Sequence, residues 1–149
     1  MKNIAEKHNE PAPLSENATS DIVQDGEQLY RDFEIANRDF ERARLTHEIA
    51  RLRKGMDDFL QKENFHQGQI VVWKENMRNR KKPEYGQPAI VVDVLKVPLK
   101  DLSNPGAAYF NEPLDLVIGL FDEYGDWIVL HVDARCFVLL EEWAIQKGY

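Results

Sequence analysis

The one concentrated basic segment of the sequence lies between residues 74 and 82. It is opposed by a single acidic residue, Glu75, and its cations are Lys74, Arg78, Arg80, Lys81 and Lys82. Ammonium and guanidinium groups bind phosphates and carboxylates. Because the whole chain has a formal net charge of −7, this segment predicts a local binding site for an anionic partner.

Three side chains beside these cations could anchor a partner, and the predicted partner-binding set is Trp73, Lys74, Met77, Arg78, Arg80, Lys81, Lys82 and Tyr85. Two partners fit it. Aromatic rings next to cations suit base stacking in nucleic acid, but both halves of the chain are acidic and would repel a polyphosphate. We therefore expect a protein with an acidic surface, with nucleic acid as the alternative. A solvated loop without a partner is the plainer interpretation.

Carboxylates within apolar segments are candidates for acid–base chemistry. Asp93, Asp115 and Asp133 are of this kind, and Arg135 and His131 lie nearby in the sequence. Such residues more often face solvent or pair with arginine to anchor a turn, and no nucleophile or orienting group accompanies them. We expect no catalytic residues, and a small enzyme with a carboxylate and histidine site is the second alternative.

The composition also bears on metals and cofactors. One cysteine, Cys136, and four histidines cannot form an intramolecular disulfide or a typical zinc site. No Gly-rich phosphate loop is present. The sequence predicts no metal, no cofactor and a reducing compartment, which we take to be the cytoplasm. No segment has the roughly 18 uninterrupted apolar residues that a membrane span requires.

The elements that position these residues are five short apolar runs between residues 68 and 140. Their period-two alternation and intervening turns predict five antiparallel strands. A short turn with Gly125 joins the third and fourth runs into a hairpin, and Asp133–Arg135 is long enough for one tight helical turn. Gly119 predicts a bulge or bend in the third run.

These strand and loop lengths resemble an SH3-like small barrel over about residues 66–141. The resemblance rests on the strand count, a long first loop, a long second loop, the hairpin and the helical link. It implies a five-stranded antiparallel barrel, here within residues 66–149 and ending in a helical turn. The proline-rich ligand specificity of peptide-binding SH3 domains is not implied, because their acidic and aromatic loop motif is absent.

A long helix is predicted over residues 20–63, where no proline occurs. Ser20 or Asp21 is the expected N-cap, and Gly55 is a weak point. Apolar side chains follow heptad spacing with a register change near residues 43–49, and the predicted oligomerisation seam is Ile22, Leu29, Phe33, Phe40, Leu45, Ile49, Leu52, Met56 and Phe59. The partner helix could be antiparallel or part of a bundle.

The sequence as a whole predicts an α+β protein with three parts. Residues 1–19 are an expected disordered tail because they lack large apolar side chains. Residues 20–63 form a coiled-coil or helical-bundle stalk, and residues 66–149 form the barrel. We expect a homo-oligomeric adaptor, not an enzyme, that binds a protein partner through its barrel loops.

Overall fold

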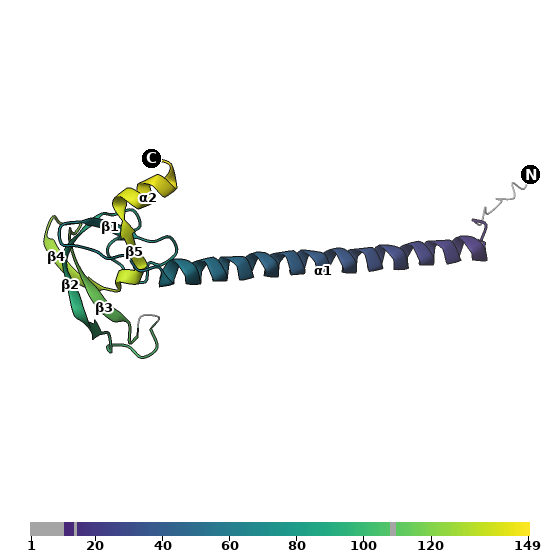
Figure 1. Ribbon diagram of the computed structural model, residues 1–149. Coiled ribbons are helices and arrows are strands. Elements are labelled where there is room, and N and C mark those ends of the chain that lie inside the picture. The colour runs from purple at the N-terminus through teal and green to yellow at the C-terminus, as the bar shows by residue number, and fades with distance from the viewer. Residues whose placement is uncertain (1–10, 14, 108–109) are drawn as a thin grey trace, which may run out of the picture. The chain divides into compact units, whose positions relative to one another are not determined.

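The computed structural model describes residues 11–13, 15–107 and 110–149. It shows the expected α+β organisation of one long helix followed by an antiparallel sheet (Figure 1). The elements are α1 (Glu16–Leu60), β1 (Ile70–Trp73), β2 (Ala89–Lys100), β3 (Pro113–Phe121), β4 (Trp127–Val132), the 3-10 helix η1 (Ala134–Cys136), β5 (Phe137–Leu139) and α2 (Leu140–Lys147).

The chain divides into two compact units between Ala50 and Arg51. The last turns of α1 therefore belong to the same unit as the sheet. No helix in the described part of the chain is both long enough and apolar enough to cross a bilayer.

Helix α1 begins at Glu16, earlier than the expected start at Ser20 or Asp21. The Ser15 hydroxyl accepts a hydrogen bond from the Ala18 amide at 3.3 Å, so Ser15 satisfies an amide that the first turn leaves free. Residues 16–19, which we expected in the tail, are thus helical. The helix passes through Gly55 without a break and ends at Leu60.

The five strands form one antiparallel sheet in the order β4-β3-β2-β1-β5. The expected hairpin joins β3 to β4, and its turn is closed by a 3.0 Å hydrogen bond from the Asp122 amide to the Asp126 carbonyl. The expected helical turn between the last two strands is η1. The sheet is open and not a closed barrel, because β4 and β5 are its two edges.

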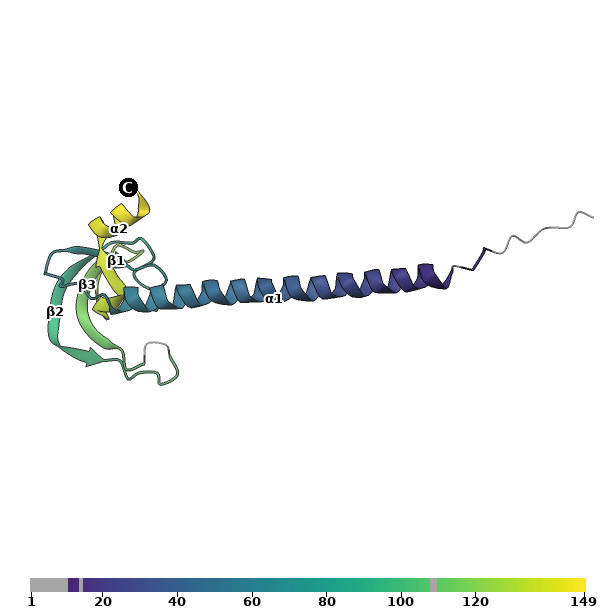
Figure 2. The same ribbon diagram turned by 45° about the vertical axis from the view of Figure 1, so that its right-hand side comes forward.

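Strand β2 supplies the irregularities of this sheet. Its register against β3 shifts between Val91 and Asp93 and again between Val94 and Leu99, and Figure 2 shows both strands strongly curved. Of the bulge or bend expected at Gly119, the bulge is absent, since β3 and β4 pair there without a register shift. A Cβ at Gly119 would instead lie 2.2 Å from the Trp127 ring, so glycine leaves room for that indole.

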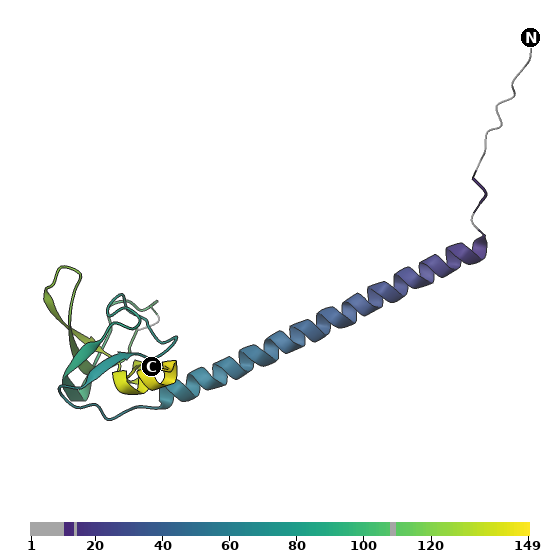
Figure 3. The ribbon, with the colours of Figure 1, turned by 90° about the horizontal axis from the view of Figure 1, so that it is seen from above.

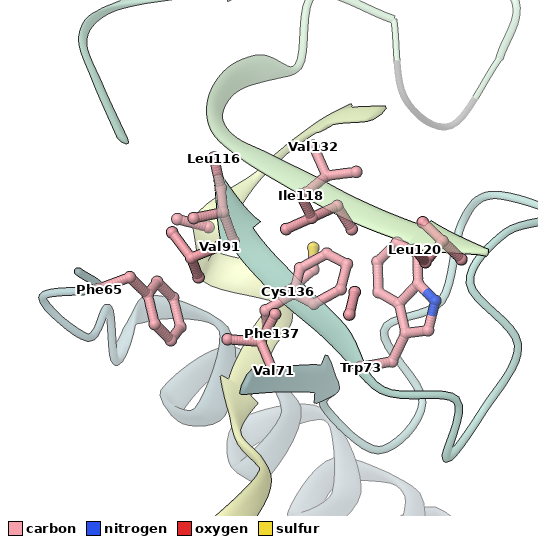
Figure 4. Close-up of a cluster of buried hydrophobic side chains, with 12 residues drawn as sticks. Phe65, Val71, Trp73, Val91, Leu116, Ile118, Leu120, Val132, Cys136 and Phe137 are labelled. Atoms are coloured by element: carbon pink, nitrogen blue, oxygen red, sulfur yellow. The ribbon is translucent and has the colours of Figure 1, made fainter. Parts of the chain in front are cut away.

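The core is a cluster of buried side chains from all five strands, η1 and Phe65 (Figure 4). The rings of Trp73 and Phe137 stack with centroids 4.2 Å apart, and Val71 and Val72 are fully buried on opposite faces of β1. Strand β1 is therefore covered on both sides. In α2, Trp143 is half-buried whereas Ile145 is exposed, so of these two side chains only the tryptophan packs against the rest of the domain.

Candidate binding surfaces

The predicted seam of α1 is an exposed apolar surface. None of the α1 residues is buried. Eight of the seam side chains are between 47 and 70% exposed, namely Ile22, Leu29, Phe33, Phe40, Leu45, Ile49, Leu52 and Met56. A helix gains most of its stability from packing an apolar face, so this surface is suited to a partner helix.

Phe59 differs from the rest of the predicted seam. It packs against the core cluster of the sheet, and the Arg135 guanidinium lies 4.3 Å from the centre of its ring. Phe59 therefore attaches the end of α1 to its own domain, and we remove it from the oligomerisation surface.

Lys74 in the basic segment also has a structural role. Its ammonium donates hydrogen bonds to the carbonyls of Asp58, at 2.6 Å, and Gln61, at 2.5 Å. These carbonyls are at the C-terminal end of α1, where carbonyl groups lack hydrogen-bond donors within the helix and where positive charge is favoured. Lys74 thus caps α1, and its side chain is not free to contact a partner.

Arg80 is the second cation held within the domain. Its guanidinium pairs with Asp101 and with Glu112, each at 2.9 Å, and the Asn79 amide donates to the same Glu112 carboxylate. Both acids lie in the connection between β2 and β3. Arg80 therefore ties the basic segment to a second loop instead of presenting its charge to solvent.

The remaining cations differ in how far they are neutralised. Lys82 pairs with Glu84 and Glu123 at 3.4 and 3.2 Å. Arg78 donates to the carbonyls of Arg80 and Lys81 and lies 5.6 Å from the centre of the Tyr85 ring. Its charge is not cancelled by these contacts. Lys81 and Tyr85 are exposed. We call Arg78, Lys81 and Tyr85 together the loop patch.

Two of the predicted anchors, Trp73 and Met77, are much less accessible than Tyr85. Trp73 is 1% exposed, and its indole N–H donates to the Pro83 carbonyl at 2.7 Å. Met77 packs against the core cluster. Both side chains pack inside the domain and hold the loop in place, so neither is a surface anchor for a partner.

The carboxylates considered for catalysis anchor turns. Asp115 is buried, accepts a hydrogen bond from the Ala134 amide at 2.9 Å and pairs with Lys62. Asp133 is buried and binds the Arg135 guanidinium through both oxygens. Asp93 and His131 are exposed. Asp115 and Asp133 are therefore interior residues, whereas Asp93 and His131 lie at the surface.

Cys136 lies close to two carboxylates. One ligand atom each of Glu112, Asp133 and Cys136 fall within 4.8 Å of one another, but the two acids are already paired with Arg80 and Arg135. Burial, and then the negative charges of Asp133 and Glu112, raise the pKa of the Cys136 thiol to about 12. The thiol is protonated at neutral pH and is a poor nucleophile or metal ligand.

A cavity of about 210 Å³ lies between the end of α1, the segment after β1, and α2. Its lining includes Glu63, Lys74, Glu142, Trp143 and Lys147. Sequence reasoning missed this site, because Glu63 and Glu142 are far apart in the chain and neither belongs to a motif. It brings carboxylates and ammonium groups from separate segments together around one cavity.

Glu63 is the perturbed group of this cavity. Burial, and then the neighbouring Glu142 carboxyl, raise the pKa of the Glu63 carboxyl to about 7, while the Leu139 backbone and Lys74 act in the opposite direction. Burial also lowers the pKa of Lys74. Since the folded protein holds the Glu63 proton more tightly than the unfolded chain, its stability falls as the pH rises from about 4.5 through 7.

We expect Glu63→Gln to remove this loss of stability. The variant should be about 1 kcal/mol more stable than the wild type near pH 8, a value reduced for the solvent that screens a half-exposed carboxyl, and equally stable near pH 4.5. Thermal unfolding at both pH values measures the difference. Glu142→Gln should move this loss of stability to lower pH, because the Glu142 carboxyl raises the pKa of Glu63 in the wild type. A stability difference for Glu63→Gln that is the same at both pH values would contradict the assignment.

Comparisons of the chain with protein-family models, curated proteins and solved structures find no match.

Proposed function

We propose that this protein is a homo-oligomeric binding or adaptor protein without catalytic activity. The observation that carries the proposal is the exposed apolar seam of α1. Leaving this many large apolar side chains in water is unfavourable, and their heptad spacing is that of helices that pair with helices. We propose that the partner of this seam is the α1 helix of a second copy of the same chain.

We further propose that the C-terminal domain is an open form of an SH3-like small barrel. Its five antiparallel strands, the tight β3–β4 hairpin and the helical turn η1 before β5 support this interpretation. Loops of such a domain are suited to binding, although a fold alone does not establish a function.

The loop patch of Arg78, Lys81 and Tyr85 is the proposed contact with a protein partner. Arginine and tyrosine are frequent contributors to binding energy at protein interfaces. Nucleic acid is the weaker candidate, since affinity for it grows with the number of phosphates contacted and the charges of Arg80 and Lys82 are compensated by carboxylates. If the stalk brings several patches together, weak individual contacts add.

The proposal is tested by the mass of the intact chain in solution. We expect sedimentation equilibrium at micromolar concentration to give a mass greater than one 17.3 kDa chain. A monomer over the whole micromolar range would contradict the proposed self-association.

A further inference from the structure

The outer strand of the β3–β4 hairpin is an open edge of the sheet (Figure 3). Strand β4 spans Trp127–Val132 and pairs only with β3 in the described part of the chain. Proteins usually protect such an edge with proline, lysine, a bulge or a covering segment. The β4 sequence has neither proline nor lysine, and its pairing with β3 has no register shift.

The opposite edge of the sheet differs from β4. Strand β5 has only three residues, Phe137–Leu139, and is followed directly by α2. A short edge that runs into a helix leaves little backbone to pair with another strand. The open edge of this domain is therefore β4.

The residues of β4 that direct their backbone outward can be identified from the hairpin. Asp122 and Asp126 form the hydrogen-bonded pair that closes the turn, and hydrogen-bonded pairs alternate along an antiparallel ladder. The uninterrupted register then assigns Ile128, Leu130 and Val132 to the bonds with β3. Trp127, Val129 and His131 direct their N–H and C=O groups to the free edge.

The same three residues carry exposed side chains on the outer face of the sheet. Trp127 is 51% exposed and Val129 is 45% exposed. The Trp127 ring lies over Gly119 and meets Phe121 edge to face at 5.3 Å. An open backbone edge thus coincides with an exposed aromatic and aliphatic surface, the combination that favours strand addition.

We propose that β4 pairs with β4 of a second copy of this chain in an antiparallel arrangement. The strand is complementary to itself when Val129 lies opposite Val129 of the second copy and Trp127 lies opposite His131 of the second copy. In this register every outward-directed residue of one strand faces an outward-directed residue of the other. All three can then exchange their backbone hydrogen bonds, and the exposed side chains form one continuous row.

This pairing is distinct from association through α1. It uses only residues of the unit that begins at Arg51, so one interface can exist without the other. If both exist, each chain has two self-interfaces, and association can extend beyond a dimer.

Disulfide trapping in the full-length chain tests the pairing and its register. In Val129→Cys the two new thiols lie opposite each other, with Cα atoms about 5.5 Å apart. The native Cys136 is buried and does not compete. We expect mild oxidation to give at least about tenfold more covalent dimer than in the Val97→Cys control, although Val97 is 82% exposed and Val129 only 45%.

His131→Cys is the register control. In the proposed pairing the two residues at position 131 are about 13 Å apart, too far for a disulfide, so this variant should form little dimer. Val129→Cys that forms no more dimer than Val97→Cys, or less than His131→Cys, would overturn the proposal. An oligomer by sedimentation that gives no trapped dimer at position 129 would leave the α1 association intact and remove only the β4 pairing.

Discussion

The double variant Phe33→Glu and Phe40→Glu is expected to lose self-association through α1 and to have a lower mass in solution than the wild type. Both rings are about two-thirds exposed on α1 and share the heptad seam. Burying one such ring contributes about 1.5–3 kcal/mol, and glutamate at a helix–helix contact adds the cost of desolvating a charge. Association should weaken by at least about 3 kcal/mol, more than a hundredfold, measured by sedimentation equilibrium.

A matched control adds the same charge outside the seam. Gln24→Glu and Gln28→Glu change two exposed residues of α1 that lie off the seam in the heptad pattern, and this variant should associate as the wild type does. Equal loss of association in both variants would show that added charge, and not the seam, is responsible. Unchanged association of the phenylalanine variant would remove the seam from the proposed interface.

The elements of this fold that sequence reasoning predicted are those set by local chemistry. Period-two alternation located the strands, and the turn residues around Gly125 located the hairpin. The start of α1 was misplaced because several polar residues near it are good N-caps, and propensity alone does not choose Ser15 among them.

The roles of individual charged residues were not predictable in the same way. Lys74 and Arg80 were grouped with their neighbours because all five cations are close in sequence. Their actual partners are the end of α1 and, for Arg80, a carboxylate 32 residues away. Such contacts depend on how distant segments pack, which no local pattern encodes. The raised pKa of Glu63 was not predictable from the sequence either, because it depends on burial and on Glu142, which is distant in the chain.

Arg80→Ala is expected to cause the largest loss of stability among single changes in the basic segment. The side chains of Asp101 and Glu112 are about nine-tenths buried, and removing Arg80 leaves two such carboxylates without their cation. Breaking a buried ion pair from one side costs 3–5 kcal/mol, and for the partly exposed Arg80 we expect about 2 kcal/mol. Thermal unfolding should show a Tm lower by about 10 °C.

Lys81→Ala provides the matched comparison, because Lys81 is exposed and has no ion pair among the contacts that the structure describes. Its stability should stay within about 0.5 kcal/mol of the wild type. Lys81→Glu should likewise fold normally but retain less of an acidic protein partner in capture from cell lysate, with nuclease present to remove nucleic acid. An Arg80→Ala variant as stable as Lys81→Ala would show that Arg80 does not tie the two loops together. Arg80 would then again be a candidate residue for contact with the partner.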